Sequence, residues 1–188
     1  MTTIHQPRVS QRVMNLAHWS TQNARRLPQH TALVWGERMW TWAELDARVS
    51  ALARALSDLG VKQGQGVLVH SKNSNEMLES MLATFRLGAV WVPTNFRLMP
   101  DEVVYMARVS GASVFLCQAD FPEYADAVCQ AAPDTQVVWM VGDRPAPDDR
   151  PPVETLIVKL GRIERQDPCH REDRVAAVRI DRPLRRNG

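Results

Sequence analysis

The amino-acid sequence predicts an α/β fold, with a doubly wound, mostly parallel sheet that has helices on both faces. Three observations support this prediction. Short apolar segments recur along the chain, segments with helical spacing lie between them, and turn or capping residues separate the two kinds. Strands that are apolar on both faces and alternate with helices are typical of a parallel sheet that is covered on both sides.

The N-terminal segment, residues 1–30, is expected to be helical. Leu16 and Trp19 have helical spacing, and Pro28 ends the pattern. A hairpin of two short strands should follow, with Gly36 at the first position of its turn. Glycine at that position suits a two-residue turn of type II′.

The clearest element is a helix after Trp40. Thr41 is a good N-cap, and Glu44 three residues later completes a capping box. Gly60 is placed to end the helix in a left-handed conformation. Five leucine and valine residues at alternating spacings of four and three form its apolar face: Leu45, Val49, Leu52, Leu56 and Leu59.

The remainder of the α/β domain, which we place at residues 31–141, alternates regularly. Asn73 is the expected cap of a helix that Gly88 stops, and Pro100 opens a second helix that Gly111 terminates. A third helix is expected at residues 122–132. The four strands of the parallel sheet are expected at residues 66–69, 89–92, 113–117 and 136–141. Four tryptophans in strand patterns are expected in the core: Trp35, Trp40, Trp91 and Trp139.

The pattern ends after this domain. Residues 142–160 are rich in proline and read as a linker with one short strand. Residues 161–188 form an arginine-rich tail without a sustained apolar period, which we expect to be disordered or out of frame.

The composition and charge of the chain limit the classes of protein to which it can belong. The 188 residues carry a net charge of +2 and are 45% hydrophobic, which indicates a globular protein and gives no reason to expect nucleic-acid binding. No apolar run is long enough to span a bilayer, and no signal peptide is recognisable, so we expect a cytoplasmic protein. The three cysteines, Cys117, Cys129 and Cys169, have the spacing of neither a disulfide framework nor a zinc site. No metal site is expected.

Two segments are similar to a known family. Residues 40–46 (WTWAELD) resemble the aromatic-Thr-aromatic-x-Glu-Leu segment of AMP-forming acyl-CoA synthetases, which are adenylate-forming enzymes. Residues 86–98 (RLGAVWVPTNFRL) resemble the more specific Leu-Gly-Ala-x-x-x-Pro-x-Asn-x-Arg-Leu segment of the same family. Residues 100–103 and 110–112 follow at the family's spacing. The resemblance therefore identifies about three quarters of the chain with the N-terminal subdomain of these enzymes.

The resemblance implies a reaction. The family converts fatty or other carboxylic acids to acyl-adenylates with ATP and magnesium, then transfers the acyl group to coenzyme A. It uses a phosphate loop rich in Thr, Ser and Gly that ends in Pro-Lys. Residues 167–169 stand about where the family's preceding strand begins, but residues 170–174 (HREDR) do not continue the pattern.

Two interpretations follow from this departure. The first is a truncated N-terminal part of an acid–CoA ligase that is inactive alone, so that ATP, magnesium and coenzyme A belong to the full-length enzyme. Its exposed apolar face would then favour self-association. The second is a stand-alone, non-catalytic α/β module that binds a protein partner or a nucleotide.

Arg97 is the main candidate for a binding residue, and no catalytic residue is assigned. The resemblance implies that Arg97 contacts a phosphate of coenzyme A, for which a guanidinium is suited. The alternative is a structural arginine that bonds to carbonyl groups or to Asp101. His70 ends a strand, where α/β folds place residues that face ligands, but a structural histidine explains the position as well.

Overall fold

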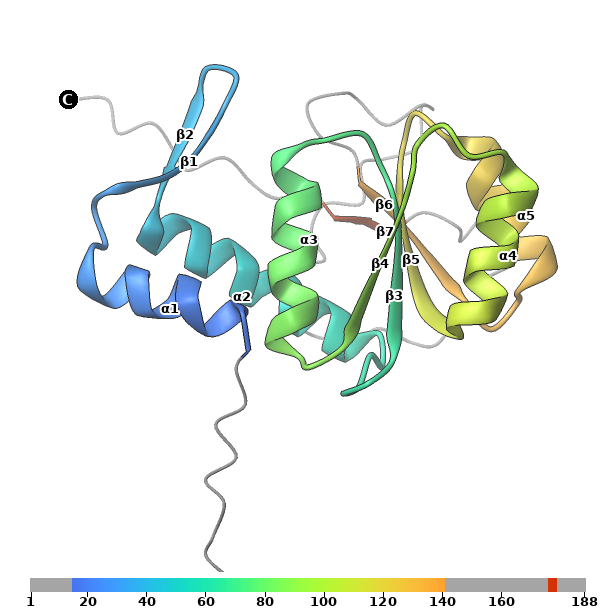
Figure 1. Ribbon diagram of the computed structural model, residues 1–188, viewed down its shortest axis with the longest axis horizontal. Coiled ribbons are helices and arrows are strands. Elements are labelled where there is room, and N and C mark those ends of the chain that lie inside the picture. Colours follow the sequence, from blue (N-terminus) through green and yellow to red (C-terminus); the bar gives the residue numbers. More distant parts are fainter. Residues whose placement is uncertain (1–14, 141–175, 179–188) are drawn as a thin grey trace, which may run out of the picture.

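A computed structural model describes residues 15–140 and 176–178 and contains two sheets (Figure 1). A hairpin of β1 and β2 stands apart from a five-stranded sheet, whose order is β4-β3-β5-β6-β7 and whose strands are all parallel. The elements in chain order are α1 (Ala17–Arg26), β1 (Thr31–Trp35), β2 (Arg38–Thr41), α2 (Trp42–Asp58), β3 (Gly66–His70), α3 (Asn75–Arg86), β4 (Val90–Thr94), α4 (Pro100–Ser110), β5 (Ala112–Gln118), α5 (Pro122–Ala131), β6 (Gln136–Met140) and β7 (Ala176–Val178).

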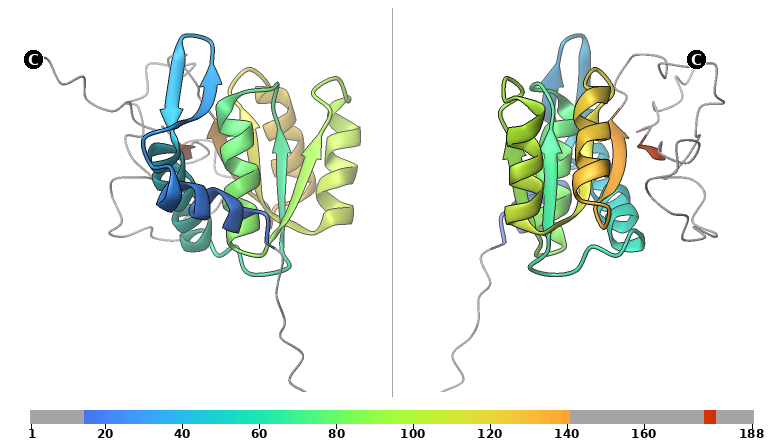
Figure 2. Two further views of the ribbon diagram at one scale, coloured as in Figure 1. Left: turned by 60° about the vertical axis from the view of Figure 1, so that its left-hand side comes forward. Right: turned by 90° about the vertical axis from the view of Figure 1, so that its right-hand side faces the viewer.

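Helices cover both faces of the larger sheet, as the sequence predicts. Helices α2 and α3 lie on one side, and α4 and α5 lie on the other (Figures 1 and 2). The side chains of β3 alternate between the two layers: Val67 and Val69 pack with α2 and α3, and Leu68 packs with α4 and α5. Every residue of β3 is buried. The fold is therefore the doubly wound α/β arrangement expected for an acyl-CoA synthetase N-terminal subdomain.

The predicted capping box of α2 is confirmed. The Thr41 hydroxyl accepts a hydrogen bond from the Glu44 amide at 3.2 Å, and the Glu44 carboxylate accepts one from the Thr41 amide at 2.8 Å. At the other end of the helix, Gly60 has φ of +91°, a conformation that residues with a side chain rarely adopt. Four residues of the predicted apolar face are buried, Leu45, Val49, Leu52 and Leu56, and the fifth, Leu59, is partly buried against the same core.

Three details differ from the sequence prediction. Ser74 caps α3 in place of Asn73, because its hydroxyl accepts a hydrogen bond from the Met77 amide at 3.1 Å. Strand β4 continues through Pro93, which is tolerated because β4 lies at the edge of the sheet, where an N–H group is not needed on the open side. Trp35 is 45% exposed on the hairpin and does not belong to the core.

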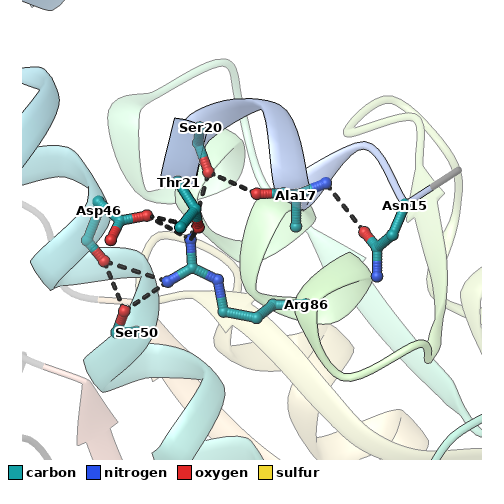
Figure 3. Close-up of polar contacts among 7 residues, drawn as sticks. All are labelled: Asn15, Ala17, Ser20, Thr21, Asp46, Ser50 and Arg86. Atoms are coloured by element: carbon teal, nitrogen blue, oxygen red, sulfur yellow. Dashed lines mark hydrogen bonds and ion pairs between the residues drawn. The ribbon is translucent and has the colours of Figure 1, made fainter. Parts of the chain in front are cut away.

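Arg86, in the last turn of α3, joins three helices (Figure 3). Its guanidinium donates to the Asp46 carboxylate of α2 at 2.6 Å and to the Ser50 hydroxyl. It also donates to the hydroxyls of Ser20 and Thr21 on α1, at 3.2 and 3.0 Å. These bonds attach the N-terminal helix to the α2–α3 layer.

Most of the expected linker and tail lies outside the described residues. The exception is a segment of the tail, residues 176–178, which forms β7 and extends the sheet beside β6. The expectation of a tail without ordered structure is corrected for these three residues. A segment too short to show a period can still pair, because strand pairing uses the backbone rather than a side-chain pattern.

The cap and the core of α2 can be tested separately. Thr41→Ala removes the acceptor for a helix N–H and should lower the free energy of unfolding by about 1 kcal/mol. Leu52→Ala leaves a core cavity and should cost about 2–5 kcal/mol. Denaturant melts monitored by circular dichroism measure both, with Arg54→Ala, an exposed position of the same helix, as a control that should stay within about 0.5 kcal/mol of the parent chain. Two silent variants would contradict the burial of α2.

Candidate functional site

The carboxyl edge of the parallel sheet is the part of the fold best placed to hold a ligand. The chain leaves β3 towards β4 and leaves β5 towards β6, although β3 and β5 are neighbours in the sheet. The two outgoing segments therefore diverge. Open α/β sheets bind their ligands outside the carboxyl ends of strands at such a point.

His70 ends β3 at this edge and is fully buried. Its Nδ1 lies 2.7 Å from the hydroxyl oxygen of Thr94, its register partner on β4. That hydroxyl donates its own proton to the Val69 carbonyl at 3.0 Å. Since a hydroxyl has one proton to give, the imidazole must be the donor in the first bond, and His70 carries its proton on Nδ1.

The other ring nitrogen of His70 is a bare acceptor. Its ring stacks on Tyr124 with centroids 4.2 Å apart, and the Phe121 ring meets it edge-on at 4.8 Å. Tyr124 is itself held by a 2.7 Å hydrogen bond from its hydroxyl to the Leu98 carbonyl. Nε2 is buried and has no hydrogen-bond partner within the described part of the chain. The structural role that the sequence suggests for His70 therefore accounts for only one of its ring nitrogens. Nδ1 has a hydrogen-bond partner, and Nε2 has none within the described residues.

Burial shifts the pKa values of two titratable groups on adjacent strands at this edge, His70 and Cys117. Burial lowers the pKa of His70, and the negative charge of Glu123 opposes that change without reversing it. Cys117, the register partner of His70 on β5, has a pKa raised well above its usual range by burial. Near neutral pH the imidazole is therefore uncharged and the thiol is protonated, which excludes Cys117 as an activated nucleophile.

Gln118 joins the loops that follow β3 and β5. Its side-chain oxygen accepts a hydrogen bond from the Lys72 amide at 2.8 Å and lies 3.1 Å from the hydroxyl oxygen of Ser71. Its nitrogen donates to the Asp120 carboxylate at 2.8 Å, and that carboxylate lies 4.0 Å from the Lys72 ammonium. Sequence reasoning missed this cluster. Its only signal is that polar residues directly follow two apolar strands.

Arg97 lies at the same edge, in the loop between β4 and α4, and is exposed. Its backbone N–H donates to the Asn95 side chain at 3.0 Å, and its guanidinium lies over the Phe96 ring at 5.4 Å. Within residues 15–140 and 176–178, the guanidinium has no hydrogen bond to a carbonyl and no ion pair with Asp101. The purely structural role considered for this arginine therefore has no bond to support it in that part of the chain.

Within residues 15–140 and 176–178, no group of three or more His, Cys, Asp or Glu side chains is arranged to hold a metal ion. No helix in those ranges combines the length and the apolar character needed to cross a bilayer.

Comparison with known proteins gives a consistent result. Residues 20–178 match the family described as AMP-binding enzyme. The chain is 37% identical over 141 residues to a feruloyl-CoA synthase from Amycolatopsis and 34% identical over 125 residues to a 3-hydroxybenzoate/4-hydroxybenzoate CoA ligase from Thauera aromatica. These matches cover 75% and 66% of this chain but only 28% and 24% of the two relatives.

A solved structure agrees with the sequence matches. The fatty acyl CoA synthetase of Mycobacterium tuberculosis is similar with a TM-score of 0.62 and 28% sequence identity, over 66% of this chain and 26% of that one. The chain thus spans about a quarter of the length of the proteins that it resembles.

The buried His70 makes stability depend on pH. Its ordinary pKa is 6.5 and the folded-state value is lower, so the unfolded chain binds more protons as the pH falls through 6.5. The stability contributed by neutral His70 is present above that pH and is lost progressively below it, by at most about 1.4 kcal/mol per pH unit. His70→Asn keeps a donor near Nδ1 but does not titrate, and should flatten this slope in urea melts between pH 7 and pH 5.

The matched control is His30→Asn, which changes an exposed histidine. It should leave the slope of the parent chain unchanged. An equal flattening by both variants, or a parent chain with no slope, would show that His70 is not the group responsible.

Proposed function

The chain belongs to the AMP-binding enzyme family, and we propose on that basis that it is the N-terminal part of an AMP-forming acid–CoA ligase. The observation that carries the proposal is the family match over residues 20–178, together with relatives that are CoA ligases for several different acids. A non-catalytic module would not need the ligase pattern of residues 86–98. Membership in a ligase family favours the enzymatic interpretation over that alternative.

The reaction proposed for the complete ligase has two steps. A carboxylate oxygen of the acid attacks the α-phosphorus of ATP, an acyl-adenylate forms, and pyrophosphate leaves with the electrons of the broken P–O bond. The thiolate sulfur of coenzyme A then attacks the acyl carbon, a thioester forms, and AMP leaves. Magnesium and positively polarised N–H groups would stabilise the charge that develops on the phosphates.

We propose that the 188 residues do not perform the first step alone. Stabilising the phosphates calls for backbone N–H groups and a cation held in a glycine-rich loop. The three lysines of the sequence, Lys62, Lys72 and Lys159, lie in no such loop, and no run of Thr, Ser and Gly ends in Pro-Lys. Among these lysines, Lys72 is placed beside Asp120 and over the Phe121 ring, where it neutralises a carboxylate.

Arg97 is the residue that we propose to act in the second step, by holding a phosphate of coenzyme A. Its guanidinium is exposed at the carboxyl edge of the sheet and forms no hydrogen bond within residues 15–140 and 176–178, so its planar group can donate two parallel hydrogen bonds to a phosphate. The Phe96 ring beneath it limits the directions that the side chain can take. A lysine could supply the charge at this position but not the two parallel bonds.

Pyrophosphate release tests the proposed lack of adenylation. The purified chain, mixed with ATP, magnesium and a panel of aromatic and fatty acids, should release no pyrophosphate above the level seen without acid. A coupled phosphate assay on a verified full-length CoA ligase serves as the positive control. Acid-dependent turnover by the 188 residues, retained through two further purification steps, would overturn this part of the proposal.

Calorimetric titration with coenzyme A tests Arg97. Because a hydrogen bond to a charged group contributes about 1.5–3 kcal/mol, Arg97→Ala should weaken coenzyme A binding by about tenfold or more. Arg54→Ala removes an exposed arginine from α2 and should have no effect. Equal losses in both variants, or coenzyme A binding that Arg97→Ala leaves undiminished, would count against the phosphate role.

A further inference from the structure

The loop that carries Arg97 is fixed at its beginning. It spans residues 95–99, between β4 and α4. Thr94, the last residue of β4, is buried, and its hydroxyl accepts a hydrogen bond from His70 Nδ1 at 2.7 Å and donates one to the Val69 carbonyl at 3.0 Å. Both partners belong to β3, all of whose residues are buried. The chain therefore enters the loop from a point that is bonded to the core.

A side chain from α5 fixes the other end of the loop. The Tyr124 hydroxyl donates a hydrogen bond to the Leu98 carbonyl at 2.7 Å, and the two residues lie 26 positions apart in the sequence. The other bonds at this end are local: the Leu98 amide donates to the Asn95 carbonyl at 3.0 Å, and the Met99 amide donates to the Glu102 carboxylate at 2.8 Å. Among these three bonds, the one from Tyr124 attaches the end of the loop to the core.

The packing of the Tyr124 ring holds its hydroxyl in place. Tyr124 is 9% exposed, its ring stacks on His70 with centroids 4.2 Å apart, and the Phe121 ring meets it edge-on at 5.6 Å. A tyrosine has only two side-chain torsions, so a ring packed on two sides leaves its hydroxyl little freedom. Because His70 also bonds to Thr94, the stacked rings reach both ends of the loop. Between these ends lie three exposed residues, Asn95, Phe96 and Arg97.

We propose that Tyr124 is a positioning residue for Arg97, because its hydroxyl holds the loop in the conformation that presents the guanidinium at the carboxyl edge. Its benefit to coenzyme A binding rests on the proposed contact between Arg97 and a phosphate. Without the bond from Tyr124, the backbone at Leu98 samples more conformations, and a bound phosphate must then order it. Fixing the backbone before the ligand arrives avoids that loss of entropy, so the phosphate binds more tightly.

Hydrogen exchange of the full 188-residue chain, measured by NMR, tests the anchoring of the loop. Tyr124→Phe removes the hydroxyl and keeps the ring, and it should accelerate exchange of the Arg97 and Leu98 amides by about threefold or more. Amides of β5 exchange through global unfolding, so their rates correct for any loss of overall stability. Tyr105→Phe is the matched control, because Tyr105 is the other tyrosine of the chain and is 64% exposed on α4. Unchanged exchange of the loop in Tyr124→Phe, or equal acceleration in Tyr105→Phe, overturns the proposal whether or not the chain binds coenzyme A.

Calorimetric titration with coenzyme A separates positioning from general stabilisation. Tyr124→Phe should weaken binding by about threefold or more in the parent chain and should have no effect when Arg97 is already alanine, because the tyrosine acts through that side chain. An equal loss in both backgrounds overturns the proposal, since Tyr124 would then support the fold rather than Arg97. If Arg97→Ala leaves coenzyme A binding undiminished while Tyr124→Phe still accelerates exchange in the loop, the phosphate role of Arg97 fails and the anchoring of the loop by Tyr124 is supported.

Discussion

The rest of the fold depends on the burial of strand β3, all five of whose residues are buried. A strand with no exposed position needs a neighbour on each edge and a helical layer on each face. Strands β4 and β5 supply the edges, and the two helical layers supply the faces. One layer contains a buried charge: Glu79 of α3 lies 2.7 Å from Arg48 of α2, and its carboxylate is fully buried. Burial raises the pKa of Glu79 and Arg48 opposes the rise, so this layer depends on that pair staying together.

Features of the fold that depend on residues close together in the sequence could be predicted, whereas contacts between residues far apart in the sequence could not. The capping box of Thr41 and Glu44 involves residues three apart, so its partners are visible in the sequence. The same holds for the alternation of apolar strands and helices. The bonds of Arg86 to α1 and α2 connect residues far apart in the chain, and no sequence pattern distinguishes this arginine from an exposed one. Trp35 was misplaced because an apolar residue in a strand gives no sign of whether its sheet has a second layer.

In the candidate site, too, positions along the chain could be predicted, whereas contacts between neighbouring strands could not. The position of His70 at a strand end followed from the pattern, but its tautomer followed only from the bond between Thr94 and Val69. Arg97 was singled out by resemblance, and its guanidinium is exposed at the carboxyl edge. The Gln118 cluster was missed because a glutamine after a strand is common, and its meaning depends on which strand lies beside it. The contacts at this edge therefore depend on the order of the strands in the sheet, which the sequence alone does not reveal.

The Arg86 contacts also have a consequence for the order in which the chain folds. The bond from Arg86 to Ser20 closes a loop of 66 residues, whereas the bond to Ser50 closes one of 36. The entropy of closing a loop grows with its length, so the shorter connection between α2 and α3 is the easier to form first. Helix α1 buries only Ala17 and Ser20, which leaves little apolar area to draw it in earlier. We expect α1 to dock last, onto a guanidinium that is already held in place, and to be the first helix to detach when the domain unfolds.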